Sequence, residues 1–320
     1  MRHEMAGRNS CYNGVLLFDK QAGPSSHEAV MDIRRTIGQR RVGHTGTLDP
    51  LAEGLLVMCL GKATKIAQFL SGYDKTYEAE ICLGQRSATY DREGIDSDQG
   101  LSPIPDLNED KLQRLLSQYE GRITQKVPAY SAVKVDGQRL YRLARNGIVV
   151  DPPEREIEIR EILFLDYRKP HLRLLITCSP GTYIRSLAND LGEKIGCGAF
   201  LSGLRRLAVG ELRVKEALTL DDVRRHHEAD TLHEQLLPYE AVLRYSAITV
   251  CDDFKESVIC GKELTSANVE KLEGSFSAGD RVLLKDTDGH ILAVGTAEAA
   301  PEAFANGRGH KLFSYIRVLN

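Results

Sequence analysis

The sequence predicts an α+β fold with a large first domain and a small β-rich second domain. The unbroken apolar run Leu55–Leu60 is typical of a strand that is buried on both faces. Residues 75–84 alternate apolar and polar side chains, which indicates a half-buried strand. Beyond Tyr245 the pattern changes to short strands around residues 248–250, 281–285, 291–295 and 312–316.

The other elements follow from local patterns. Residues 14–20 and 172–178 are strand-like, and residues 86–105 are polar and acidic and are expected to form a surface loop. Ser26 is a suitable N-cap for a helix that runs to about Gly38. Apolar residues at helical spacing predict a further helix over residues 62–70 and another that opens with a capping-box-like segment at residues 106–109. A third helix is expected after the turn at residues 179–181, with its apolar stripe running from Ile184 to Ile195.

Composition narrows the class of protein. The chain has 320 residues, of which 42% are hydrophobic and 27% charged, as in an ordinary globular protein. No apolar stretch has the length of a transmembrane helix, and the first residues lack the apolar core of a signal peptide. Seven cysteines with no C-x-x-C spacing argue against a disulfide framework and a structural zinc site. We therefore expect a cytoplasmic protein without a metal.

Charge is unevenly distributed, although the formal net charge is only −3. For most single arginines, a solvated surface position is the simpler interpretation. The clustering nevertheless predicts one basic face, of the kind that contacts nucleic acid. The clustered residues are Arg34, Arg35, Arg40, Arg41, Arg139, Arg142, Arg145, Arg205 and Arg206.

The segment Gly43–Gly54 (GHTGTLDPLAEG) is the strongest candidate for chemistry. It places one carboxylate, Asp49, on a glycine-rich loop directly before the buried strand. Pro50 restricts the backbone of Asp49 and disfavours the α region there. An Asp-Pro pair in such a segment is by itself most often a turn. The adjoining residues decide between the two interpretations.

GHTGTLDPLAEGLL closely resembles the catalytic motif of the TruB family of RNA pseudouridine synthases. Other stretches resemble further family motifs in the same order: DKQAGPSSHEAV, KTYEAEICLG, VPAYSAVKVDGQRLYRLAR and SPGTYIRSLANDLG. Two positions depart from the first of these, with Gln21 in place of a proline and Ser25 in place of a threonine. The resemblance implies a pseudouridine-synthase domain over residues 1–245, with a central mixed, mostly antiparallel sheet. It also implies an RNA-gripping insertion at about 120–152 and a PUA-like β-barrel over 246–320.

The resemblance also implies roles for individual residues. Asp49 would be the catalytic carboxylate, Arg185 its partner, and Tyr77 the aromatic side chain against the target base. An adjacent guanidinium is expected to keep Asp49 ionised by lowering its pKa. Tyr77 is not favoured as a general base, because an unperturbed tyrosine has a pKa near 10; a tyrosine in the core is its simpler interpretation. The expected substrate contacts are His44, Tyr77, Tyr183 and Leu204, and the expected RNA contacts are Lys20, Arg41, Lys134, Arg139, Arg142 and Arg205.

The function that the resemblance implies is isomerisation of uridine to pseudouridine in the T loop of tRNA, at position 55. Base flipping would precede cleavage of the glycosidic bond and formation of a carbon–carbon bond. The product is an isomer of the substrate, so no cofactor is expected, and no obligate protein partner is expected either. A guide-RNA-dependent synthase acting on ribosomal RNA and a non-catalytic module that binds or folds tRNA are the alternatives.

Overall fold

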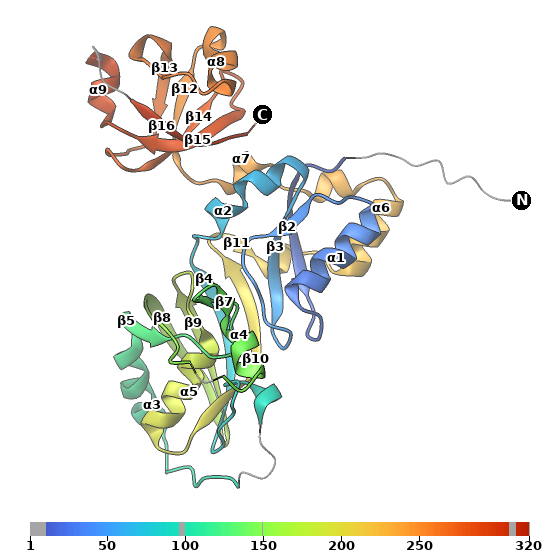
Figure 1. Cartoon of the computed structure of the whole chain (residues 1–320), viewed down its shortest axis with the longest axis vertical. Helices are drawn as coiled ribbons and strands as arrows, with labels where there is room; N and C mark the ends of the chain where they lie inside the picture. The colour runs from blue at the N-terminus through green and yellow to red at the C-terminus, as the bar shows by residue number, and fades with distance from the viewer. Residues whose placement is uncertain (1–10, 96–99, 149, 307–311, 320) are drawn as a thin grey trace, which may run out of the picture.

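The computed structural model describes residues 11–95, 100–148, 150–306 and 312–319. In the described part of the chain, strands β1–β5 and β8–β11 form one sheet in the order β1-β3-β10-β4-β9-β8-β5 (Figure 1). The short strand β2 pairs with β3, and β11 pairs with β10. The bounds of these strands are β1 (Gly14–Lys20), β2 (Val42–His44), β3 (Glu53–Leu60), β4 (Lys75–Leu83), β5 (Gly121–Lys126), β8 (Glu154–Arg168), β9 (His171–Cys178), β10 (Ala199–Val209) and β11 (Leu212–Arg213).

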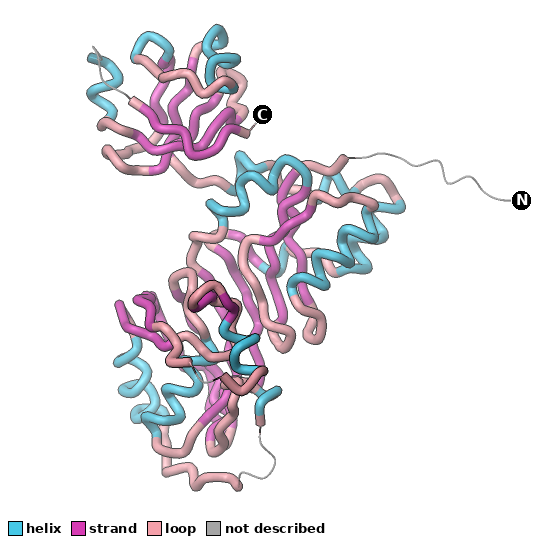
Figure 2. The backbone as a smooth tube through the Cα atoms, in the orientation of Figure 1, coloured by secondary structure: helices cyan, strands magenta, loops and turns pink. Residues whose placement is uncertain are grey.

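Helices cover this sheet (Figure 2). One large apolar cluster packs α1, α3, α5 and α6 against β3, β4 and β9, with Ile33, Leu112, Leu191 and Val223 among the helix residues. The helices of this part are α1 (Ser26–Ile37), α2 (Ala67–Leu70), α3 (Glu109–Leu116), α4 (Leu140–Arg145), α5 (Ile184–Ile195), α6 (Leu220–Glu228) and α7 (Tyr239–Val242).

The C-terminal part has its own five-stranded sheet, in the order β13-β12-β14-β15-β16, and its own apolar core. A second cluster joins the two parts, because it contains Leu17 and Phe69 of the first part and Leu283, Val294 and Leu319 of the second. The elements are β12 (Ser246–Val250), α8 (Lys255–Ile259), β13 (Val269–Glu273), β14 (Arg281–Lys285), β15 (Ile291–Ala297), α9 (Pro301–Asn306) and β16 (Phe313–Val318).

The predicted fold class, a mixed and mostly antiparallel sheet with helices and a C-terminal β domain, is confirmed. The burial of β4 alternates along its whole length, as its sequence pattern predicts. In the large sheet, β3 and β10 pair in parallel, with Glu53 opposite Arg205 and Gly54 opposite Arg206. This pairing places the end of the Asp49 loop directly against β10.

Several local predictions need correction. The N-cap of α1 is Ser25, whose side chain accepts from the Glu28 amide in a capping box, and not Ser26. The predicted helix over 62–70 is a 3₁₀ segment, Gly61–Ile66, followed by the short α2. The predicted acidic loop is not all surface, because Asp91 is buried. Residues 96–99 of that loop and residues 1–10 lie outside the described residues.

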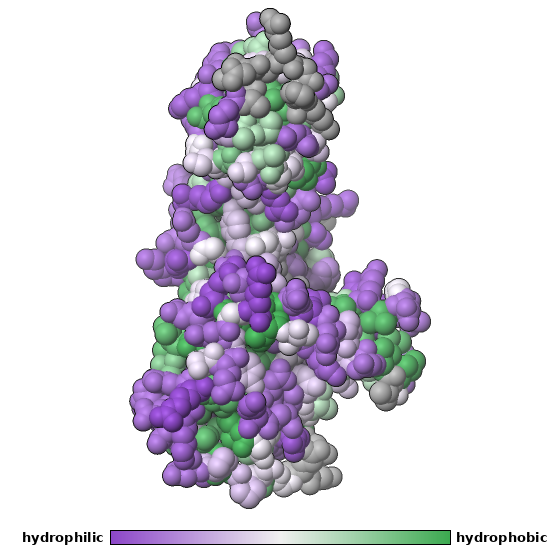
Figure 3. Space-filling model, turned by 90° about the vertical axis from the view of Figure 1, so that its left-hand side faces the viewer, coloured by the Kyte–Doolittle hydropathy of each residue, from purple (hydrophilic) through white to green (hydrophobic). Residues whose placement is uncertain are grey.

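The surface in Figure 3 is mainly hydrophilic, with isolated apolar patches. In the described parts of the chain, no helix is long and apolar enough to cross a membrane.

Candidate active site

The Asp49 loop connects β2 to β3 and is held from three sides. Ser26 Oγ lies 2.8 Å from the Leu48 carbonyl oxygen and accepts from the Leu48 amide at 2.7 Å. The fully buried Lys20 donates to the Ala52 carbonyl at 2.6 Å. Arg206, 2% exposed, donates to the carbonyls of Gly46 at 3.0 Å and Leu55 at 2.7 Å. These bonds fix the loop backbone, and with it the position of the Asp49 carboxylate.

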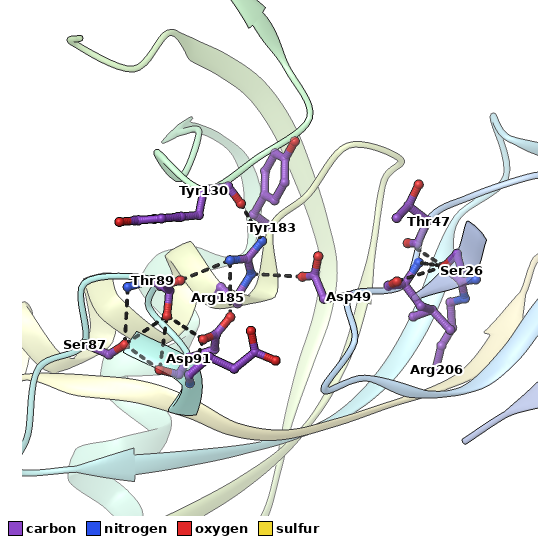
Figure 4. Close-up of polar contacts among 12 residues, drawn as sticks. Ser26, Thr47, Asp49, Ser87, Thr89, Asp91, Tyr130, Tyr183, Arg185 and Arg206 are labelled. Carbon is purple, nitrogen blue, oxygen red and sulfur yellow. Dashed lines mark hydrogen bonds and ion pairs between the residues drawn. The ribbon is translucent and has the colours of Figure 1, made fainter. Parts of the chain in front are cut away.

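Asp49 faces Arg185, the second residue of α5, across the gap between the loop and the helix (Figure 4). Arg185 Nε lies 2.9 Å from Asp49 Oδ2, although its N–H is not aligned with that oxygen, so the contact is chiefly an ion pair. The Arg185 side chain is 6% exposed and that of Asp49 is 36% exposed. The carboxylate is therefore paired on one side and open to the cavity on the other.

A second carboxylate, Asp91, also holds Arg185, with Oδ2 3.3 Å from Nη1. The guanidinium further donates to the carbonyls of Thr89 at 3.1 Å and Tyr130 at 3.2 Å. Asp91 is fixed in turn, because its Oδ1 accepts from the Glu93 amide and the Thr89 hydroxyl. Asp91 was not predicted as a site residue, because its acidic segment has the composition of a solvated loop.

A cavity of about 490 Å³ opens beside this ion pair, within the usual range for ligand sites. Tyr77 of β4 and Leu204 of β10 line it next to Asp49, while Tyr130 and Tyr141 line it from the segment that contains α4. The other lining residues are Thr45, Gly46, Thr47, Leu48, Ser71, Lys75, Ser131, Ala132, Ser179, Pro180, Gly181, Thr182, Tyr183, Ile184, Arg185 and Arg206. An aromatic and aliphatic slot beside a carboxylate suits a planar polar base.

Comparisons with known proteins match both parts of this architecture. Residues 34–184 match the family described as TruB family pseudouridylate synthase (N terminal domain), and residues 185–244 match the tRNA pseudouridylate synthase B C-terminal domain. The PUA domain family matches residues 246–319. The tRNA pseudouridine synthase B of Xanthomonas campestris pv. campestris (strain B100) is 41% identical over 301 residues, which cover 92% of this chain and 94% of that protein. The chain belongs to the TruB family of pseudouridylate synthases.

Other similar proteins agree with this assignment. The tRNA pseudouridine synthase B of Staphylococcus epidermidis (strain RP62A) is 38% identical over 271 residues, covering 81% of this chain and 89% of that protein. The solved structure titled "Crystal Structure of a Cbf5-Nop10-Gar1 Complex" has a TM-score of 0.77 and 26% identity, and covers 97% of this chain and 86% of its own. The predicted family and its enzymatic class are thus confirmed.

The electrostatics of the TruB-family site differ in one respect from the prediction. Burial raises the pKa of Asp49 above its ordinary value, and the Asp91 carboxylate adds to this, whereas Arg185 opposes it. The expected net lowering of the pKa of Asp49 is therefore wrong, because desolvation outweighs the guanidinium. Burial also raises the pKa of Tyr77, so its phenol keeps its proton at neutral pH.

Two of the predicted RNA contacts bind acceptors within the protein. Lys20 is fully buried and donates to backbone carbonyls of the Asp49 loop, so it supports that loop and does not face RNA. Arg205, whose side chain is partly exposed, pairs with Asp19 at 2.7 Å and Glu53 at 3.4 Å and lines a second, smaller pocket. Both cations are bound to acceptors within the protein.

The remaining predicted residues divide between cavity and surface. Tyr77, Tyr183 and Leu204 line the cavity, whereas His44 does not, and burial lowers the pKa of its ring. Of the predicted RNA contacts, Arg41, Lys134, Arg139 and Arg142 are exposed. Gln125 was not predicted; its side chain accepts from the Tyr183 amide at 2.8 Å and donates to the Tyr183 carbonyl at 3.0 Å, which fixes the start of α5.

Within the described residues, one group of potential metal ligands lies in the turn between β14 and β15. The ligand atoms of Asp286, Asp288 and His290 lie within 4.8 Å of one another. The carboxylate of Asp286 is already bound by Lys255 and by the His290 amide. This group is unrelated to the cavity.

Proposed function

We propose that this TruB-family chain isomerises uridine to pseudouridine at position 55 in the T loop of tRNA, with Asp49 as the carboxylate on which the bond exchange depends. The observation that carries the proposal is the position of Asp49. It lies on a loop that three side chains hold, opposite Arg185, in a cavity lined by Tyr77 and Leu204. Homologues named tRNA pseudouridine synthase B supply the RNA class.

The chemistry needs little more than this geometry. The C1′–N1 bond breaks, the uracil turns, and C5 joins C1′; the proton lost from C5 balances the proton gained at N1. An ionised carboxylate beside the sugar serves as nucleophile or stabilises developing positive charge. Because the product is an isomer, no oxidant, reductant or cofactor enters the balance. Tyr77, with its phenol protonated, offers a stacking face and not a base.

The free-energy cost of flipping the base out of the RNA must be offset by contacts between that base and the cavity. Everting a base from a folded loop costs a few kcal/mol, and stacking on an aromatic ring contributes about 1–3 kcal/mol. Tyr77 is buried on the cavity side of β4 and is available for this stacking. Leu204, half-buried on the neighbouring strand β10, closes the slot with an apolar surface. Tyr183 lies at the N-cap of α5, directly before Ile184 and the arginine that pairs with Asp49.

The segment around β6 (Lys134–Val135), β7 (Gln138–Arg139) and α4 is the proposed RNA grip. It exposes Lys134, Arg139 and Arg142 while Tyr130 and Tyr141 of the same segment line the cavity. Substitution Arg142→Ala is expected to weaken RNA binding and to reduce the slope of affinity against salt by about one, with a small effect on turnover. Lys194→Ala, an exposed lysine in the last turn of α5, is the matched control.

The deciding experiment uses an unmodified T-arm hairpin and mapping of pseudouridine by position. The wild-type chain is expected to form pseudouridine at position 55, whereas Asp49→Asn binds the hairpin and forms none. Asp166→Asn, which removes a carboxylate on β8 outside the cavity, is the matched control and should retain activity. Arg185→Ala is expected to lose activity as well, because Asp49 then has no cationic partner.

The other outcomes identify the alternatives. Product that forms only when a guide RNA is added would make the chain a guide-dependent enzyme, the first alternative that the sequence left open. Tight binding by both proteins without product would make it an RNA-binding module. We place the enzyme in the cytoplasm, with the tRNA T arm as partner and no obligate protein partner. We also propose that the boundary between the synthase domain and the PUA-like domain lies between residues 245 and 246.

A further inference from the structure

The lining of the cavity includes a buried lysine that the proposed chemistry does not use. Lys75 is the first residue of β4 and shares the inward face of that strand with Tyr77. Its side chain is 7% exposed and lines the cavity together with Ser71 and Arg206. The lining of the cavity therefore contains both the Asp49–Arg185 ion pair and Lys75.

The ammonium of Lys75 is only partly satisfied by the protein. Nζ donates to the Ser71 carbonyl at 2.6 Å and to the Tyr73 carbonyl. An ammonium has three donors, so these two bonds leave one hydrogen for another acceptor. Within the described residues, no carboxylate lies within ion-pair distance of Nζ. A buried cation without an anion is costly unless a ligand supplies one.

The surroundings of Lys75 increase this need for an anion. The guanidinium of Arg206 lies near it and is occupied by the carbonyls of Gly46 and Leu55. Burial, followed by repulsion from Arg206, lowers the pKa of Lys75 to about 8, so the ammonium remains the main form at neutral pH. Two cations of the cavity lining, Lys75 and Arg206, therefore lie close together.

The spacing along β4 indicates which anion fits. Lys75 and Tyr77 are two residues apart on one strand face, which places them about 7 Å apart along the strand. That span is comparable with the separation between a base and its phosphate within one nucleotide. A uracil stacked on Tyr77 thus leaves one of its neighbouring phosphates within reach of Lys75.

We propose that Lys75 binds a backbone phosphate adjacent to the everted uridine, and so fixes how deeply the nucleotide enters the cavity. This inference rests on the proposed function, because an RNA with an everted base is the ligand. Lys75 acts here as a positioning residue that touches substrate but not the reacting atoms. The competing interpretation is that Lys75 only binds the carbonyls that follow α2.

The test measures hairpin affinity with and without Lys75, and with and without the charge on each phosphate next to the target uridine. All proteins carry Asp49→Asn so that no turnover occurs. Three T-arm hairpins are compared: one unmodified, and two with a neutral methylphosphonate on the 5′ or the 3′ side of the target uridine. With Lys75 present, one of the two modifications is expected to weaken binding about tenfold. In Lys75→Met the same modification should make no further difference.

Each comparison is made between RNAs on the same protein. A general loss of structure in Lys75→Met would weaken the binding of all three RNAs alike and would therefore cancel. Lys194→Met, which removes an exposed lysine in the last turn of α5, should respond to both modifications as the protein with Lys75 does. If each methylphosphonate weakens binding equally in the presence of Lys75 and in Lys75→Met, the phosphate contact is overturned and only the carbonyl-binding role remains. Because binding is measured without product, the result is independent of whether the chain makes pseudouridine.

Discussion

At the scale of single residues, the ionisation of Asp49 is set by opposing effects. Burial and the Asp91 carboxylate raise its pKa, while Arg185 lowers it. In the proposed reaction the carboxylate is the active form, so activity should be lost as the pH falls through this raised pKa. The acid limb of the single-turnover rate should therefore lie above the value of about 3.9 that is usual for an aspartate.

The measurement is the rate of pseudouridine formation on the T-arm hairpin between about pH 4 and pH 8, a range that spans the ordinary and raised values. Folding adds a second readout, since a raised native pKa means that ionised Asp49 disfavours the folded state. The stability of Asp49→Asn relative to wild type should then be greater near neutral pH than in acid. A relative stability that falls with rising pH would contradict the assigned direction.

Asp91 holds the guanidinium that pairs with Asp49, so its loss should affect the reaction rate. It fixes Arg185 through Nη1 at 3.3 Å but does not line the cavity. Asp91→Asn should lower the single-turnover rate at least about tenfold, since a displacement of about 1 Å can cost about 100-fold, and change hairpin affinity little. Glu93→Gln, an exposed carboxylate two residues along, is the control. A raised KM with an unchanged rate would instead assign Asp91 to RNA binding.

At the scale of elements, local patterns predicted the segments that carry the motifs but not all of their partners. The Asp49 loop, β4 and α5 follow from their own residues, and the pairing of Asp49 with Arg185 was expected from motif resemblance. β8 was not predicted, because register shifts after Ile159 and Phe164 interrupt its alternation. The burial of Asp91 could not be predicted from its local sequence either, because its partner Arg185 is distant in the chain.

The contact between β3 and β10 depends on a glycine at position 54. Gly54 has a φ of +95°, and a Cβ there would lie 2.3 Å from the Arg206 carbonyl oxygen. Gly54→Ala should therefore lower stability by at least about 2 kcal/mol and displace the Asp49 loop, with loss of activity. Gly43→Ala is the control in the same motif, because its Cβ meets nothing within 4 Å. Equal urea midpoints for the two variants would show that β3 and β10 can separate without cost.

At the scale of the whole molecule, the two sheets are joined by a common apolar cluster and not only by the linker between them. Leu283, Val294 and Leu319 of the C-terminal part pack in one cluster with Leu17 and Phe69 of the catalytic part. The sequence shows the change to short strands after Tyr245, but not which strand faces meet. That information depends on apolar side chains far apart in the chain, whose contact is non-local.

This shared cluster should make the two parts unfold together. Leu319 is 4% exposed within the cluster, and a carboxylate there must either break the packing or be buried at a cost. In calorimetry, Leu319→Asp is expected to separate the unfolding of the C-terminal sheet, at lower temperature, from that of the catalytic sheet. Ile316→Asp, at a position on β16 that is 42% exposed, should keep a single transition. If Leu319→Asp also unfolds in one transition at the wild-type temperature, the cluster does not couple the two parts, and the C-terminal sheet must be held by polar contacts such as that from Lys65 to the Val318 carbonyl.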